Sequence, residues 1–121
     1  MARIVIVEDD SLVAMGMKIY LESRNHEVVG LVSSGEQAVT AALQDAPDLV
    51  LMDVRLKGGV DGIEAARRIL ARRPLPIVFV SGSGEPQTLE RIQALQPAGL
   101  LLKPVTPADL AAEVERIVAA I

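Results

Sequence analysis

Acidic side chains stand directly after two short apolar runs of the sequence. Glu8 and Asp9 follow the run Ile4–Val7, and Asp53 follows the run Leu49–Met52. Carboxylates brought close together repel one another, and each raises the proton affinity of the others. A hard divalent cation relieves that repulsion, and Mg²⁺ suits an open site that also holds water and phosphate oxygens. Glu8, Asp9 and Asp53 are therefore candidate ligands of Mg²⁺, with Mn²⁺ as a substitute ion.

A hydroxyl and an amine follow two further apolar runs. Ser81 comes after Ile77–Val80, and Lys103 comes after Leu100–Leu102. Taken singly, Ser81 could cap a helix and Lys103 could pair with an acid. Together with the carboxylates they supply a nucleophile, a metal, a hydroxyl donor and a cation. Phosphoryl transfer needs those parts, because it depends on positioning and charge neutralisation. Asp53, Ser81 and Lys103 are thus the candidate catalytic residues, with Asp53 as the acceptor.

Five short apolar runs are expected to be the strands that position these side chains. Most of them are apolar at every position, which is typical of parallel strands covered by helices on both faces. The second run is flanked by His26 and Glu27 and contains Gly30, which favours an edge strand. The five runs are Ile4–Val7, Val28–Val32, Leu49–Met52, Ile77–Val80 and Leu100–Leu102.

Segments with helical signals separate these runs. Ser34 followed by Gln37 reads as a capping box, and Thr106-Pro107 followed by Asp109 reads as a helix start. Asp10 reads as the N-cap of the first helix. Apolar residues at helical spacing indicate the other helices, namely Leu12, Met15, Ile19 and Tyr20, then Ile63, Ala66, Ile69 and Leu70, then Leu89, Ile92 and Leu95.

Strict alternation of five strands with five helices predicts an α/β fold. We expect one domain over residues 1–121, a doubly wound five-stranded parallel sheet with order 2-1-3-4-5. Ligands of such sheets bind beyond the carboxyl ends of the strands, where the chain reverses direction. Because the first and third strands are neighbours in this order, Glu8, Asp9 and Asp53 should crowd one spot.

Composition excludes several other classes of protein. Half of the residues are apolar (50%) and the formal net charge is −4, so we expect a packed protein without nucleic-acid binding. The arginines at 67, 68, 72 and 73 read as the solvated face of a helix, because no aromatic residue interleaves with them. With no cysteine, disulfides and thiolate metal sites are excluded. No secretory signal or bilayer-length apolar stretch is present, so a cytoplasmic protein without membrane contact is expected.

Five motifs in order resemble the receiver domains of bacterial two-component response regulators. Ile4–Asp10 resembles the acidic start, Pro47–Asp53 the phospho-acceptor strand, and Asp61–Ala65 the start of the third helix. Ser81 and the pair Lys103-Pro104 match the hydroxyl and lysine–proline positions of that family. The resemblance covers the whole chain. It implies the flavodoxin-like receiver fold and a phosphoprotein that switches protein–protein interactions in phosphorelay signal transduction.

The resemblance also implies a role for each candidate residue. Asp53 would accept the phosphoryl group from a phosphohistidine in a Mg²⁺-dependent reaction. Asp9 and Asp53 would ligate Mg²⁺ directly, Glu8 would act through water, and the backbone carbonyl of Arg55 would be a further ligand. Ser81 and Lys103 would bind phosphoryl oxygens, with a cis peptide bond between Lys103 and Pro104.

By the same resemblance, the partners are a sensor histidine kinase or phosphotransfer protein, and a downstream protein target or output domain. The chain would be a switch that phosphorylates and dephosphorylates itself, and not an enzyme with a separate substrate. It is either a stand-alone receiver or a fragment of a larger regulator or hybrid kinase. A homodimer through a helix face is compatible with the sequence, although nothing requires it.

Two features depart from the family pattern. Leu100 stands where many receivers carry an aromatic residue whose rotation reports phosphorylation, so switching here cannot use such a rotor. The segment Val54–Asp61 is one residue longer than the common form and contains Gly58-Gly59. Three rival functions are less favoured by the sequence. An aspartate-nucleophile phosphatase needs a second Asp at position 55, where this chain has Arg55. A flavodoxin-like cofactor carrier needs a glycine-rich loop after the first strand, where this chain has acidic residues. A degenerate receiver is disfavoured because the acids, the hydroxyl and the lysine are all present.

Overall fold

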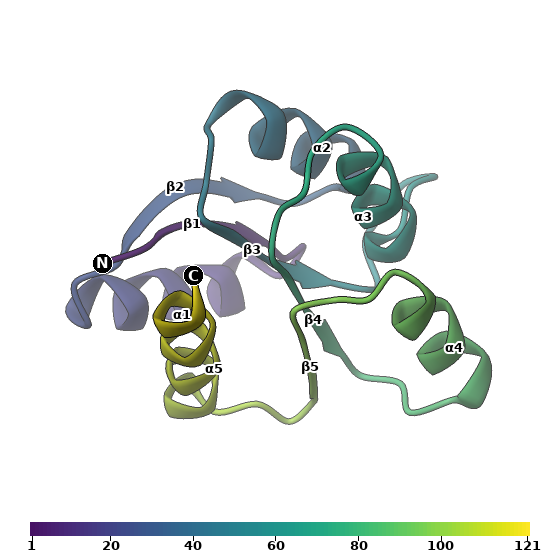
Figure 1. Ribbon diagram of the computed structural model, residues 1–121. Coiled ribbons are helices and arrows are strands. Elements are labelled where there is room, and N and C mark those ends of the chain that lie inside the picture. Colours follow the sequence, from purple (N-terminus) through teal and green to yellow (C-terminus); the bar gives the residue numbers. More distant parts are fainter.

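Five strands and five helices alternate along the chain, as the sequence predicts (Figure 1). The computed structural model of the protein describes residues 1–121. The strands are β1 (Arg3–Val7), β2 (Glu27–Val32), β3 (Leu49–Asp53), β4 (Ile77–Ser81) and β5 (Gly99–Leu102). The helices are α1 (Ser11–Ser23), α2 (Gly35–Gln44), α3 (Gly62–Leu70), α4 (Pro86–Ala94) and α5 (Pro107–Ala120).

The strands form one parallel sheet in the order β2-β1-β3-β4-β5, which confirms the predicted topology. β2 lies at an edge, also as predicted. β1 and β3 are neighbours, and their register sets Val7 opposite Met52. The residues that follow, Glu8 and Asp53, therefore reach the same edge of the sheet.

Helices cover both faces of the sheet, because each buried strand sends alternate side chains to opposite sides (Figure 1). Val5, Met52 and Phe79 belong to a core of 17 buried residues that includes residues of α2, α3 and α4. Ile4 and Leu51 belong to a second core of 12 buried residues with α1 and α5. Full burial of each such side chain contributes about 1.5–3 kcal/mol. These two layers stabilise the sheet whose carboxyl edge carries the acids.

The buried residues of α1 are not the residues whose helical spacing predicted this helix. Its buried residues are Ala14 and Leu21. Leu12, Met15 and Ile19 are instead 84%, 45% and 63% exposed. The helix is apolar on most of its circumference, so spacing alone does not distinguish the side that meets the sheet. The result is an exposed stripe of Leu12, Met15 and Ile19 at positions i, i+3 and i+7, which we call the α1 stripe.

Side-chain caps begin three of the helices much as the sequence indicates. Asp10 accepts hydrogen bonds from the backbone N–H groups of Leu12 and Val13. Thr106 and Asp109 form the full reciprocal capping box of α5. At α2 the box is only half formed, because the Gln37 side chain accepts from the N–H of Ser33, one residue before the Ser34 cap.

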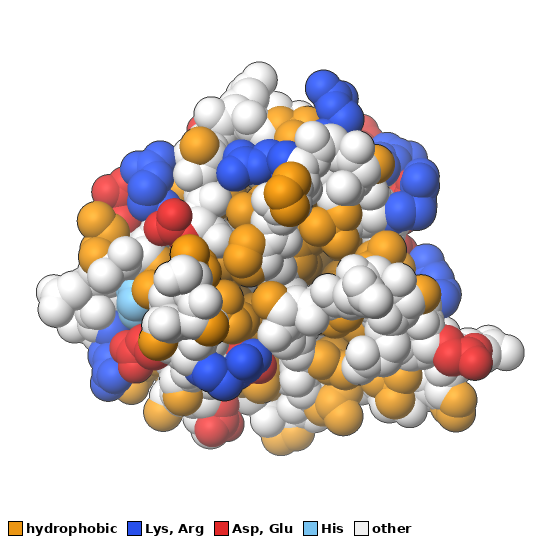
Figure 2. Space-filling model, in the orientation of Figure 1, with side chains coloured by type: hydrophobic (Ala, Val, Ile, Leu, Met, Phe, Trp, Pro, Cys, Tyr) orange, Lys and Arg blue, Asp and Glu red, His pale blue; other side chains and the backbone are white.

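An apolar hollow lies at the end of the strands opposite to the acids. Figure 2 shows hydrophobic side chains gathered in the middle of this face, between α5 and the pair α3 and α4. A cavity of about 310 Å³ here is lined mainly by Leu75, Ile77, Phe79 and Ile117.

The ring of His26, which is also remote from the acids, is buried, and its Nδ1 accepts from the N–H of Ala2 at 3.2 Å. His26 directly precedes β2, as the sequence indicates, and its ring is part of the packing.

The first residue of α3 lies directly against the backbone of Asp53. The N–H of Gly62 donates to the carbonyl of Val54 at 2.8 Å. A Cβ atom at Gly62 would lie well inside van der Waals contact with the Asp53 carbonyl oxygen, whereas one at Gly59 would meet nothing within 4 Å. Only glycine therefore lets α3 begin this close to the end of β3.

Replacing Gly62 with alanine should destabilise the protein, although alanine is the better helix former by about 1 kcal/mol. The added methyl must displace a backbone carbonyl, and overpacking of this kind costs about 1–3 kcal/mol or more. Chemical denaturation should show a lower free energy of unfolding for Gly62→Ala. Gly59→Ala is the control and should change it by less than about 0.5 kcal/mol. Equal effects of the two substitutions would contradict the close approach.

Candidate functional site

Three carboxylates meet where β1 and β3 end. One oxygen each from Glu8, Asp9 and Asp53 lies within 4.8 Å of the others, a geometry that could hold a metal ion. Glu8 and Asp53 are buried, and Asp9 is half-buried. The structure thus brings together the acids that the sequence singles out. Asp10, the fourth acid of this region, serves as the cap of α1.

Burial of these acids has a clear electrostatic consequence. Desolvation, a hydrogen bond with Asp53 and repulsion from the Asp53 charge raise the pKa of Glu8 to about 7. A hydrogen bond to Glu8 Oε2 from the N–H of Asp10, at 3.2 Å, and the charge of Lys103 oppose this rise. Without a bound cation, Glu8 therefore takes up a proton near neutral pH. A divalent ion with oxygen ligands would replace that proton, so the donor set fits such an ion.

Lys103 supplies positive charge to the same spot. Its Nζ lies 3.3 Å from Asp53 Oδ2 and 3.8 Å from Glu8 Oε1. The N–H of Lys103, directly after β5, donates to the carbonyl of Ser81 at 2.8 Å, and this bond holds the backbone of Lys103 beside the end of β4. The peptide bond between Lys103 and Pro104 is cis, as the resemblance implied.

Ser81 is buried at the end of β4, one residue beyond Val80, which pairs with Asp53 across the sheet. Its hydroxyl donates to the carbonyl of Ser83 at 3.1 Å and accepts from the N–H of Ser83 at 3.1 Å. The hydroxyl is thus near the acidic edge but engaged with the following loop. To donate to a group on Asp53 it would have to release the Ser83 carbonyl, because a hydroxyl has one hydrogen.

A cavity of about 680 Å³ opens beside Asp53. One wall is polar and includes Glu8, Asp9 and Lys103, and Arg55 also lines it. The other wall is apolar and is built by α1 and the segment that follows Lys103, with Leu12, Val13, Gly16, Met17, Pro104, Val105, Pro107 and Leu110. Sequence reasoning missed this apolar wall, because its two halves are remote along the chain and meet only in the folded protein.

The comparison with known families agrees with this geometry. The family model described as the response regulator receiver domain matches residues 4–115. The chain belongs to the response regulator receiver domain family. As a receiver domain of two-component signalling, it has the five-stranded α/β fold with the acidic edge that is described above.

Relatives of this receiver domain include regulators and separate receiver structures. The transcriptional regulatory protein PdtaR of Mycobacterium tuberculosis is 34% identical over 93% of this chain and 55% of its own length. The phyllosphere-induced regulator PhyR of Methylorubrum extorquens is 30% identical over 94% of this chain and 42% of its own length. The chain therefore spans about half the length of these curated relatives.

The fold is shared with solved receiver structures. The signal receiver domain of a modulated diguanylate cyclase from Desulfovibrio desulfuricans G20 is 37% identical to the chain, with a TM-score of 0.90. The match covers 99% of this receiver domain and 95% of that chain. In the present receiver domain, no helix has the length and hydropathy needed to cross a membrane.

The raised pKa of Glu8 makes the stability of the cation-free receiver depend on pH. The folded-state pKa of about 7 lies above the ordinary value of 4.5, so protonated Glu8 stabilises the fold. That contribution is complete below pH 4.5 and is lost as the pH rises through about 7. The loss amounts to up to about 3 kcal/mol, since a pKa difference of one corresponds to about 1.4 kcal/mol.

Denaturation in the presence of a chelator, from pH 4.5 to 8, measures this effect. The free energy of unfolding should fall with rising pH in the unmodified chain, and the slope should flatten in Glu8→Gln. The matched control is Glu27→Gln, because Glu27 is an exposed glutamate at the start of β2, at the end of the sheet opposite to Glu8. If the Glu8→Gln profile keeps the original slope, the buried carboxyl is not its source.

Proposed function

We propose that Asp53 accepts a phosphoryl group from the phosphohistidine of a sensor histidine kinase or phosphotransfer protein. The observation that carries this proposal is the cluster of Glu8, Asp9 and Asp53 with Lys103 Nζ at 3.3 Å from Asp53. A carboxylate beside a cation and two further acids is suited to a metal-assisted attack on phosphorus. The apolar core beneath holds Asp53 in place. Residues 1–121 act as one receiver domain in this proposal.

The cluster is proposed to hold Mg²⁺, for which Mn²⁺ would substitute. Asp9 and Asp53 would be direct ligands, Glu8 would act through water, and the carbonyl of Arg55 would complete the protein ligands. When bound, the ion would neutralise charge on the carboxylates and on the phosphoryl oxygens. The raised pKa of Glu8 supports this assignment, because it reports a local excess of negative charge together with burial.

Asp53, Lys103 and Ser81 each have a separate role in the proposed transfer. An oxygen of Asp53 forms the new bond to phosphorus, while the bond from phosphorus to the imidazole nitrogen breaks and the imidazole leaves with its electron pair. Lys103 holds a phosphoryl oxygen by charge, and Ser81 donates its hydroxyl hydrogen to another after turning from Ser83. The product is a modified receiver that changes its protein contacts, so the chain works as a cytoplasmic switch, acting on a downstream protein target or output domain.

The apolar wall of the cavity is proposed to receive the phosphodonor protein. Leu12 and Gly16 of α1 line this wall, and the α1 stripe continues from it across the surface to Ile19. An apolar stripe beside a phospho-acceptor suits the apolar face of a helix that carries the donor histidine. The large exposed fractions of Leu12 and Ile19, 84% and 63%, give these residues no role in the core.

Incubation with Mg²⁺ and acetyl phosphate should add one phosphoryl group to Asp53. Asp53→Asn should abolish the modification, because the amide is not a nucleophile of comparable strength. Asp48→Asn is the control, since Asp48 is exposed just before β3, at the opposite end of the sheet. Intact mass and peptide mapping locate the label. A label that persists in Asp53→Asn would show that another residue is the acceptor.

Polar substitution of the α1 stripe should separate protein donors from small donors. Transfer from the phosphorylated histidine kinase that acts fastest on the unmodified chain should fall at least about tenfold in Leu12→Asn/Ile19→Asn, as for central interface residues. Labelling by acetyl phosphate should be unchanged, because neither side chain belongs to the group formed by the three carboxylates and Lys103. Leu31→Asn, at an exposed leucine of the edge strand β2, is the control. Equal losses with both donors would contradict a docking role.

A further inference from the structure

The helix α4 is the least firmly attached helix of the molecule. Ile92 is its one buried residue, and its N-cap, Glu85, makes no side-chain capping hydrogen bond. By comparison, α5 buries four residues and α3 buries five. The chain reaches α4 from Ser81 through Gly82-Ser83-Gly84, and glycine widens the conformations open to that connection. Little apolar burial therefore opposes a displacement of α4.

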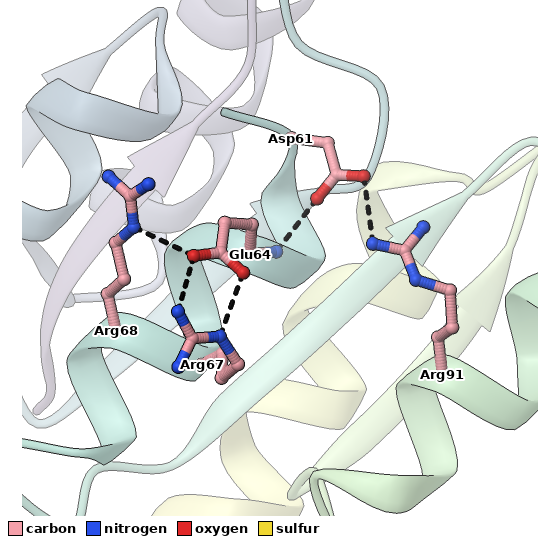
Figure 3. Close-up of polar contacts among 5 residues, drawn as sticks. All are labelled: Asp61, Glu64, Arg67, Arg68 and Arg91. Atoms are coloured by element: carbon pink, nitrogen blue, oxygen red, sulfur yellow. Dashed lines mark hydrogen bonds and ion pairs between the residues drawn. The ribbon is translucent and has the colours of Figure 1, made fainter. Parts of the chain in front are cut away.

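One ion pair joins α4 to a neighbouring element. Figure 3 shows Arg91 reaching from α4 to Asp61, and Arg91 Nη2 lies 3.2 Å from Asp61 Oδ2. No other side-chain hydrogen bond or ion pair links α4 to another helix or strand. The two arginines of α3 differ in this respect. Arg67 and Arg68 both pair with Glu64 of their own helix, and together they lower the pKa of Glu64 to about 2.

Asp61 is itself held firmly, and it is held next to the acceptor. Its other oxygen, Oδ1, accepts from the N–H of Glu64 at 2.7 Å and so caps α3 (Figure 3). The next residue is Gly62, whose backbone lies against the Asp53 carbonyl. One carboxylate thus serves two helices, and its position is fixed relative to the backbone of Asp53.

A second path leads from the acceptor to α4 through Ser81. Its hydroxyl donates to the Ser83 carbonyl, and the Ser83 hydroxyl in turn accepts from the N–H of Glu85, the cap of α4. If Ser81 turns to a phosphoryl group on Asp53, the bond to Ser83 is lost. The β4–α4 connection is then loosened, and the Arg91–Asp61 pair is the remaining polar tie that keeps α4 in place.

We propose that the Arg91–Asp61 ion pair holds α4 in its docked position while Asp53 is unmodified, and that it sets how readily modification of Asp53 frees α4. This inference rests on the proposed function of Asp53. The pair is weak, because Arg91 and Asp61 are 55% and 36% exposed. A weak ion pair is sufficient to shift the equilibrium between docked and displaced positions of α4, because this helix has one buried residue. By linkage, a contact made only in the docked position of α4 opposes modification of Asp53 by the same free energy by which it stabilises that position.

Hydrogen exchange of the unmodified protein tests whether the pair holds α4. Arg91→Gln and Asp61→Asn each remove the ion pair, and asparagine keeps the cap of α3 because it is as good an N-cap as aspartate. Each variant should speed exchange of the α4 amides about 1.5- to 5-fold, the range expected for an exposed ion pair. The double variant should show the same increase as either single variant. Arg68→Gln is the matched control and should leave α4 unchanged.

Beryllofluoride binding in the presence of Mg²⁺ tests the link to the acceptor. Arg91→Gln should lower the apparent Kd by the same factor by which it speeds α4 exchange, whereas Arg68→Gln should not. Unchanged α4 exchange in both single variants, or fully additive effects in the double variant, would overturn the inference. An unchanged Kd in Arg91→Gln would overturn its second part. Failure of the unmodified chain to bind beryllofluoride at Asp53 would refute the proposed function instead, and the exchange arm would still decide whether the pair holds α4.

Discussion

The crowding of negative charge at one edge of the sheet is the constraint on which this molecule depends. Glu8 and Asp53 are both buried, and Asp9 lies with them. Such an arrangement is unfavourable by itself, so other interactions must stabilise it. The two apolar cores fix the strands, Lys103 compensates part of the charge, and a proton on Glu8 compensates more when no cation is bound. The fold thus keeps an acidic group that could hold a divalent cation, and such an ion would relieve the repulsion among the carboxylates.

Much of the fold was predictable because apolar runs and helix caps are local signals. The runs ending at Val7 and Met52 give the strands directly, and the order of the sheet follows from alternation and crossover handedness. The orientation of α1 was not predictable. Ala14 and Leu21 face the sheet, and an apolar outer side hides that choice from any analysis of spacing. The half-formed box of α2 was not predictable either, because the Gln37 side chain accepts from the N–H of Ser33 instead of the N–H of Ser34.

The acids of the site were predictable for a different reason, namely that residues after neighbouring parallel strands must converge. Features made by remote segments could not be found in this way. The apolar wall joins α1 to the residues after Lys103, and Arg91 meets Asp61 across 30 residues. The engagement of the Ser81 hydroxyl with Ser83 is likewise a matter of side-chain geometry. Sequence spacing identifies which groups can take part in chemistry, and the structure adds what each group does when no ligand is bound.

A change at Asp53 can displace only an element whose attachment is comparable in free energy to the interactions that the change adds or removes. Helices that bury four or five residues, as α5 and α3 do, are held by several kcal/mol of apolar burial. Leu100, half-buried on β5, offers no polar group that could carry the change. The helix α4 meets the requirement, because it has one buried residue and begins five residues after Ser81, the last residue of β4. Its two polar paths to Asp53, through Ser83 and through Asp61, are the contacts from which we infer that α4 responds to a change at Asp53.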